Sequence, residues 1–202
     1  MKTTLILIVL GLLAVNGYAK ETPFIAYSKA APTKNVFFAN GKTADPAQSP
    51  ALIQTESPFA SKWIGNAIWA QKDTTLDKIV LYVSEIADGA RGATISISIM
   101  EMDKNNPYGR PAQILQTDEK LIIPNDVKND GYIVVNVTDF PMLEGRWYGF
   151  LLHFEQAAPN RRINFSQTVR ADEPRAGLFY SIDEGASYEI GNTSLHFLLQ
   201  SK

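Results

Sequence analysis

Gly145-Arg-Trp-Tyr-Gly-Phe-Leu-Leu-His-Phe154 is the stretch of sequence that decides the fold. It is the densest run of aromatic and aliphatic residues outside the N-terminus. A short apolar run bounded by turn residues indicates a buried strand, because a helix usually needs a longer stretch. Glu144-Gly145 supplies the turn before it, and Ala158-Pro159-Asn160 ends it. A strand this apolar must be covered on both faces, so we expect a second sheet packed over it.

The flanking sequence predicts more strands of the same kind. Residues 94–102 alternate cleanly, with Ile95, Ile97 and Ile99 on one face and Thr94, Ser96 and Ser98 on the other. This alternation indicates a half-buried strand with one wet face. Roughly nine or ten strands follow one another at short spacing, with no convincing helix between them. The sequence therefore predicts an all-β protein, an antiparallel β-sandwich of jelly-roll form.

The N-terminus has the pattern of a secretory signal peptide. Lys2 is followed by an apolar region from Leu5 to Val15, and Gly17-Tyr18-Ala19 places small residues where a signal peptidase cleaves. We expect residues 1–19 to be removed and the chain to be exported, to the periplasm, the cell surface or the medium. An uncleaved membrane anchor is the alternative, although the apolar region is short for a bilayer.

After cleavage, two parts are expected. Residues 20–62 are rich in proline, which disfavours helices and central strands, so they predict an irregular lead-in with an edge strand. Residues 63–202 predict the β-sandwich domain.

Composition excludes several classes of protein. Without Lys2, the chain has 18 basic and 21 acidic residues, and no basic patch indicates nucleic acid as a partner. No further apolar run is long enough to span a membrane. The chain has no cysteine, so it has no disulfide and no thiolate site, which favours a bacterial exported protein over an animal one.

The catalytic inventory is poor. His153 and His196 both lie inside apolar strands, and neither a His-Glu-x-x-His nor a Gly-x-Ser-x-Gly motif is present. Glycoside hydrolysis needs two carboxylates across a cleft. The carboxylates that could converge are Glu101, Asp103, Glu155 and Glu184. A small polysaccharide-degrading enzyme, a lyase or a glycosidase, therefore stays an alternative.

The order of features resembles a known class of module. Two strands, residues 76–83 and 94–102, precede Pro107-Tyr108-Gly109; residues 145–148 precede a buried strand; and Tyr180-Ser-Ile-Asp-Glu-Gly-Ala-Ser-Tyr188 lies near the C-terminus. This order resembles the β-sandwich modules of bacterial extracellular proteins, of the galactose-binding-like and carbohydrate-binding-module kind. Ala186 and Tyr188 depart from it, since those modules commonly have Trp at the second position. The resemblance implies a β-sandwich that binds sugars over about residues 63 to 200.

Aromatic rings suit sugar binding, because the C–H face of a pyranose stacks on a ring. We predict a ligand-binding set in or beside loops: Trp63, Tyr108, Arg110, Tyr180, Asp183 and Tyr188. The alternative is that the rings cap the ends of the sandwich and that Asp183 only builds a β-turn. Trp69 and Trp147 lie in strand-like runs, and we assign them to the core.

Three functions remain open. The first is a secreted, non-catalytic, ligand-binding β-sandwich whose partner is a glycan. The second is the polysaccharide-degrading enzyme, and the third is a structural or adhesive surface protein. No cofactor is expected, a structural calcium ion is possible in principle, and neither the sugar nor the oligomeric state follows from the sequence.

Overall fold

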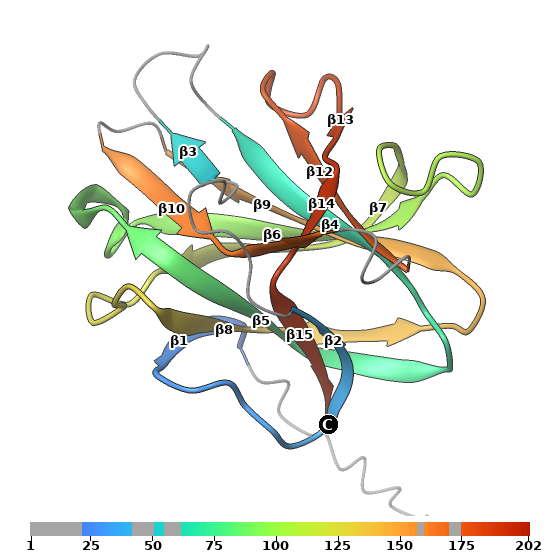
Figure 1. The fold of residues 1–202 in the computed structure, drawn as a ribbon, viewed down its shortest axis with the longest axis horizontal. Helices are drawn as coiled ribbons and strands as arrows, with labels where there is room; N and C mark the ends of the chain where they lie inside the picture. Colours follow the sequence, from blue (N-terminus) through green and yellow to red (C-terminus); the bar gives the residue numbers. More distant parts are fainter. Residues whose placement is uncertain (1–21, 42–50, 55–61, 157–159, 170–174) are drawn as a thin grey trace, which may run out of the picture.

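A computed structural model describes residues 22–41, 51–54, 62–156, 160–169 and 175–202. These residues form two large antiparallel sheets packed face to face (Figure 1). No α-helix occurs among them, and the one helical element is the single 3-10 turn η3 (Asp88–Ala90). The all-β antiparallel sandwich is thereby confirmed, whereas the jelly-roll connection pattern is not.

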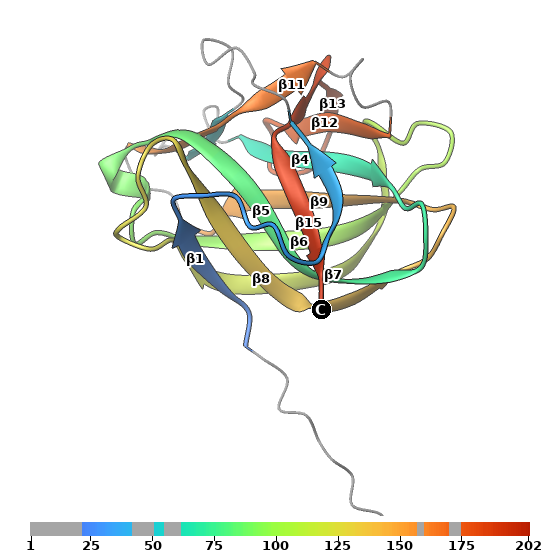
Figure 2. The same cartoon turned by 60° about the horizontal axis from the view of Figure 1, so that its bottom comes forward.

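The first sheet, sheet A, has seven strands. The long strand β5 pairs with β8 along one edge, and β1 continues the sheet beyond β8 (Figure 2). The other edge of β5 is shared, because β15 pairs with its first half and β10 with its second half. β2 then flanks β15, and β3 flanks β10. The strands are β1 (Phe24–Ser28), β2 (Val36–Asn40), β3 (Ala51–Gln54), β5 (Thr74–Ile86), β8 (Gly131–Met142), β10 (Arg161–Phe165) and β15 (Phe197–Ser201).

The second sheet, sheet B, has six strands in the order β13-β12-β4-β9-β6-β7. The strand predicted from the opening stretch is β9, which lies between β4 and β6. The strands are β4 (Trp63–Trp69), β6 (Thr94–Met102), β7 (Pro111–Ile122), β9 (Trp147–Phe154), β12 (Ala176–Ser181) and β13 (Glu189–Ile190). Two short strands, β11 (Gln167–Val169) and β14 (Thr193–Leu195), pair with each other in a separate antiparallel ladder. In the sequence, β11 directly follows β10 and β14 directly precedes β15.

The main core fills the space between the two sheets. Every second residue of β9 is buried there, from Tyr148 to Phe154. The rings of Phe150 in sheet B and Phe197 in sheet A meet edge to face, with centroids 5.2 Å apart. Sheet A thus covers one face of β9, as expected. The opposite face is covered differently, by aromatic side chains of sheet B itself and of its loops.

The predicted wet face of β6 is drier than expected. The three isoleucines do face the main core, but Ser96 and Ser98 on the other face are also buried. Ser98 shares a hydrogen bond with Thr117 on β7 (Oγ to Oγ1, 3.0 Å), and the Ser96 hydroxyl donates to Glu155. Polar side chains can therefore be buried on this face because their neighbours satisfy them.

Strands from the expected lead-in belong to sheet A. β1, β2 and β3 lie within residues 20–62, and each takes an edge position of the sheet. The described prolines of this segment, Pro23 and Pro32, lie outside the three strands, so they do not interrupt their hydrogen bonding. In the part of the chain that the structure describes, no helix is long and apolar enough to cross a membrane. Residues 1–19, predicted as the signal peptide, lie outside that part.

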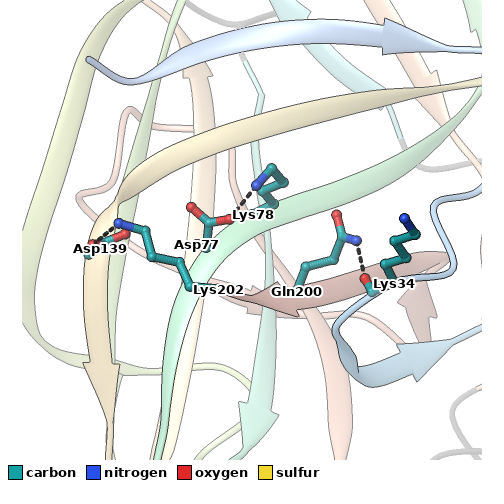
Figure 3. Close-up of polar contacts among 6 residues, drawn as sticks. All are labelled: Lys34, Asp77, Lys78, Asp139, Gln200 and Lys202. Carbon is teal, nitrogen blue, oxygen red and sulfur yellow. Dashed lines mark hydrogen bonds and ion pairs between the residues drawn. The ribbon is translucent and has the colours of Figure 1, made fainter. Parts of the chain in front are cut away.

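Polar contacts attach the C-terminal end of the chain to its neighbours in sheet A (Figure 3). The Gln200 amide donates to the Lys34 carbonyl at 2.6 Å, and Lys202 pairs with Asp139 at 2.6 Å. Asp77 lies at the register break of β5 and pairs with the adjacent Lys78. These contacts tie β15 to β8 and to the segment that precedes β2.

A buried hydrogen-bond network of two asparagine side chains links β4 of sheet B and β2 of sheet A to β14. The side-chain oxygen of Asn66, on β4, accepts from the Leu195 backbone N–H (2.9 Å) and from the Ser194 hydroxyl (3.0 Å). The Asn40 amide, on β2, donates to Ser194 and to the Leu195 carbonyl. Asn40, Asn66 and Ser194 are all buried.

Candidate functional site

Alternation along β4 and β9 sends their tryptophans to the outer face of sheet B, away from sheet A. Trp63 and Trp69 share this face with the small residues Gly65 and Ala67, whereas Ile64 and Ile68 enter the main core. Trp147 on β9 shares it with Leu151. All three tryptophan side chains are only half buried. We call this surface the aromatic face.

The middle of the aromatic face is an apolar floor that is buried beneath the surrounding rings. Its buried residues are Ala67, Met100, Met102, Leu151 and Phe179. The Phe179 ring lies directly over Gly65, where an added Cβ would lie 2.5 Å from the ring and 2.4 Å from the Phe150 carbonyl oxygen. The glycine is needed for this close approach.

One end of the aromatic face is formed by three rings. Trp69 and Trp147 are directly opposite each other in the β4–β9 ladder, and their ring centroids are 5.4 Å apart. Tyr108, from the β6–β7 loop, meets Trp147 edge to face at 5.0 Å. Tyr108 also covers Gly177, where any Cβ would lie 2.4 Å from its ring. The three rings therefore support one another.

The other end is formed by Trp63, His153 and Tyr188. Trp63 and His153 stack, with ring centroids 4.3 Å apart and planes within 20°. Gly185, at a φ of +88°, brings the β12–β13 loop against Trp63 and places Tyr188 beside Phe179. Trp63 and Trp69 are six residues apart on one strand, which separates the two ends by about 20 Å.

Carboxylates surround His153. Glu155 accepts hydrogen bonds from the Ser96 hydroxyl and from the Lys120 backbone N–H, each at 2.5 Å. Lys120 points its N–H there because its backbone has a positive φ of 58°. Burial lowers the pKa of His153 below its ordinary value, while Glu155, Glu119 and Glu184 oppose this shift. The buried His153 Nδ1 has no hydrogen-bond partner among the described residues.

Acidification is expected to destabilise the protein through its two histidines. Burial also lowers the pKa of His196, which stacks on Tyr82. Neutral imidazole is therefore favoured in the folded state, and its stabilising effect is full above the unfolded pKa of about 6.5 and is lost as the pH falls toward the folded pKa. The free energy of unfolding should fall between about pH 7.5 and 5.5, a window above the titration of ordinary carboxylates.

Urea unfolding at several pH values measures this effect. One histidine contributes at most about 1.4 kcal/mol per pH unit, and less here because both side chains keep some solvent contact. In the double variant His153→Phe, His196→Phe the curve should be flatter over the same window. An unchanged slope in that variant would refute the assignment.

The structure brings together three of the six predicted ligand-binding residues. Trp63, Tyr108 and Tyr188 all belong to the aromatic face. Tyr180 follows Phe179 on β12 and so points to the opposite side, where its hydroxyl donates to Glu189 (2.6 Å) and Lys62 lies over its ring. Arg110 is exposed, and its backbone carbonyl closes the β6–β7 loop by accepting from the Asp103 N–H.

Asp183 builds the β12–β13 turn. Its carboxylate accepts from the Ser187 hydroxyl (2.5 Å), the Ser187 N–H (2.9 Å) and the Ser181 hydroxyl (2.7 Å). These hydrogen bonds lower the pKa of Asp183 to about 2. A role in building the β-turn accounts for all of these contacts of Asp183. The turn also positions Gly185 and Tyr188.

Trp69 and Trp147, which we assigned to the core, are half buried on the outer face of sheet B and lie outside the main core, although Trp147 packs against the smaller buried cluster of that face. Their place on the outer face could have been predicted from the alternation of side chains along each strand, since odd- and even-numbered residues of a strand point to opposite faces. In β9 the set that includes Phe150 and Leu152 is uniformly large and apolar, so it must enter the core. Trp147 has the parity of Gly149 and His153 instead.

The four carboxylates considered for catalysis do not all converge. Glu101 pairs with Arg146 (3.6 Å), and Asp103 accepts from the Asn105 N–H in its own loop. Only Glu155 and Glu184 lie near His153. Within the described ranges, no group of three or more His, Cys, Asp or Glu side chains could hold a metal ion. The sequence predicts no cofactor, and the structural calcium ion considered beside that prediction is not tested by the described residues.

Fold and site together define an antiparallel β-sandwich with an aromatic outer face on one sheet. No protein-family model matches the chain, and no curated protein sequence matches it either.

Proposed function

We propose that this chain is an exported, non-catalytic, glycan-binding protein whose ligand lies along the aromatic face of sheet B. The observation that carries the proposal is that three tryptophans, Trp63, Trp69 and Trp147, are partly exposed on one face of one sheet. Large apolar surfaces that stay accessible to solvent mark interaction sites. The resemblance to sugar-binding modules and the predicted signal peptide support the same function.

The chemistry of the aromatic face fits a sugar chain. Indole and phenol rings offer a flat apolar surface beside polar groups, which suits a pyranose ring with its C–H faces and peripheral hydroxyls. The rings at the two ends are about 20 Å apart, so an extended oligosaccharide is needed to contact both. Glu155 and Glu119 near the Trp63 end supply hydrogen-bond acceptors for hydroxyl groups.

Neighbouring contacts fix the rings in place. Trp147 is held between Trp69 and Tyr108, and Trp63 lies on His153. A binding surface whose side chains are already ordered loses less entropy when a ligand binds. This pre-ordering supports binding by a rigid surface.

A panel of soluble neutral and acidic polysaccharides tests the proposal, by affinity electrophoresis followed by calorimetry. We expect at least one polysaccharide to bind, and Trp147→Ala to weaken that binding about 30-fold, the effect of losing an aromatic contact worth about 2 kcal/mol. Phe24→Ala is the matched control, because Phe24 is an exposed ring on β1 of the other sheet. That control should bind as the wild type does.

Two results would contradict the proposal. Absence of binding to every polysaccharide would favour the structural or adhesive alternative, in which the aromatic face contacts a protein. Release of reducing ends or unsaturated products during the incubation would favour the enzyme. The specific observation in favour of the enzyme is that Glu155 and Glu184 lie near His153 at one end of the aromatic face.

A further inference from the structure

A pocket of about 270 Å³ opens at the end of the sandwich where β4 leads into β5. The pocket is separate from the floor of the aromatic face, although Trp69 lines the pocket and also belongs to one end of that face. Its apolar lining includes Phe37 and Phe38 from β2, Trp69 from β4 and Met142 from β8, and the exposed residues Gln71 and Lys72 complete it. Residues of both sheets therefore line the pocket, which has an apolar interior and a polar rim.

The pocket is much larger than the voids of a packed protein interior, which rarely exceed a water molecule. The main core beside it is well filled, since the Phe38 ring stacks on Phe197 with centroids 5.4 Å apart. Ala70, a small buried residue, leaves the space that a larger side chain would occupy. Ligand sites in proteins begin at about 300 Å³, so this pocket suits a ligand of one ring with a short side chain.

The rim of the pocket is held in place by hydrogen bonds between two chain turns. The Ala70 N–H donates to the Arg146 carbonyl at 3.0 Å, and the Ala70 carbonyl accepts from the Gly145 N–H at 2.9 Å. The Glu144 N–H donates to the Asp73 carboxylate at 2.8 Å. A pocket with a fixed rim is pre-formed, as binding sites for small molecules usually are.

The charge at the rim indicates which ligand fits. The Lys72 ammonium forms no ion pair among the described residues, and the adjacent Asp73 carboxylate accepts from the Glu144 N–H instead. An anionic group on the ligand would complement this cation, while its apolar part lay against the aromatic lining. We infer that the pocket binds a small aromatic carboxylate, with its ring beside Phe37, Trp69 and Met142 and its carboxylate at Lys72.

The methionine methyl groups give a direct test, with 3-phenylpropionate and its neutral amide as probes. In protein labelled with ¹³C at the methionine methyls, Met142 reports on the pocket, while Met100 and Met102 report on the aromatic face. Both probes should shift the Met142 signal saturably and leave the other two unchanged. The acid should bind about two- to fivefold more tightly than the amide, the effect of one solvent-exposed ion pair.

Two variants separate the parts of the inference. Lys72→Gln, at an exposed position, should abolish the preference for the acid without changing binding of the amide. The matched control Lys128→Gln removes a lysine near the opposite end of β8 and should keep the preference. Ala70→Leu, checked for folding by thermal unfolding, should fill the pocket and prevent binding of both probes.

Three results would overturn the inference. The first is that neither probe shifts the Met142 signal. The second is that Lys72→Gln keeps the full preference for the acid, which would remove the carboxylate from the ligand class. The third is that folded Ala70→Leu still binds both probes as the wild type does.

Discussion

Replacing both Trp63 and Trp147 with alanine is expected to weaken glycan binding about a thousandfold. Each ring is assigned a contact worth about 2 kcal/mol, equal to about 30-fold in affinity. The two rings belong to opposite ends of the aromatic face, six residues apart along the β4–β9 ladder. Because the two rings stack on different partners and lie about 20 Å apart along the strand, their effects should add in free energy. Calorimetry with the polysaccharide that the wild type binds measures the single and double variants.

Additivity is the informative part of this prediction. If the ligand occupies only one end, one single variant will match the wild type and the double variant will match the other. That result would contradict a sugar chain that spans the face. Thermal unfolding of each variant is the necessary check, because Trp63 lies on His153 and both side chains are half buried.

A large loss of stability from a single polar substitution is expected for Asn66→Ala, about 3 kcal/mol. The Asn66 side chain accepts hydrogen bonds from Ser194 and from the Leu195 N–H, in a site without solvent contact. Removing it leaves two buried donors unpaired, and each unpaired buried group costs about 1–3 kcal/mol. Urea unfolding at pH 7.5 measures the loss.

Asn192→Ala provides the matched control, because Asn192 is an exposed asparagine immediately before β14. Its effect should stay within about 0.5 kcal/mol. A loss of less than about 1 kcal/mol for Asn66→Ala would mean that water or a rearranged partner satisfies Ser194 and Leu195. That result would contradict the inference that the Asn66 network holds β4 to β14.

Much of the fold could be predicted because strand periodicity is a local property. Ile95, Ile97 and Ile99 face the core as their alternation predicts, and β9 occupies a central position as its apolar run predicts. The pairing of strands is not local. Nothing in the sequence of β5 indicates that β15 and β10 share one of its edges. The prolines likewise indicated that residues 20–62 are irregular, but the described ones, Pro23 and Pro32, lie outside the strands and leave them intact.

The candidate site was only half predictable for a related reason. Trp63, Tyr108 and Tyr188 lie in or beside loops, and aromatic residues in loops are easy to single out. Trp147 lies within an apolar run, where its exposure depends on which face of the strand another sheet covers. His153 also lies within that apolar run, and its ring stacks on Trp63 on the outer face. Tyr180 shows the reverse error, because one position along β12 reverses its direction.

The central claim is that the outer face of sheet B binds a sugar chain, and the methionine methyl spectrum in the presence of glycan tests it most directly. Met100 and Met102 lie in the floor of that face, whereas Met142 lies between the sheets beside the end pocket. We predict that saturating amounts of the bound polysaccharide shift the Met100 and Met102 signals and leave Met142 in place. Binding of the polysaccharide without a shift of Met100 or Met102 would contradict this claim.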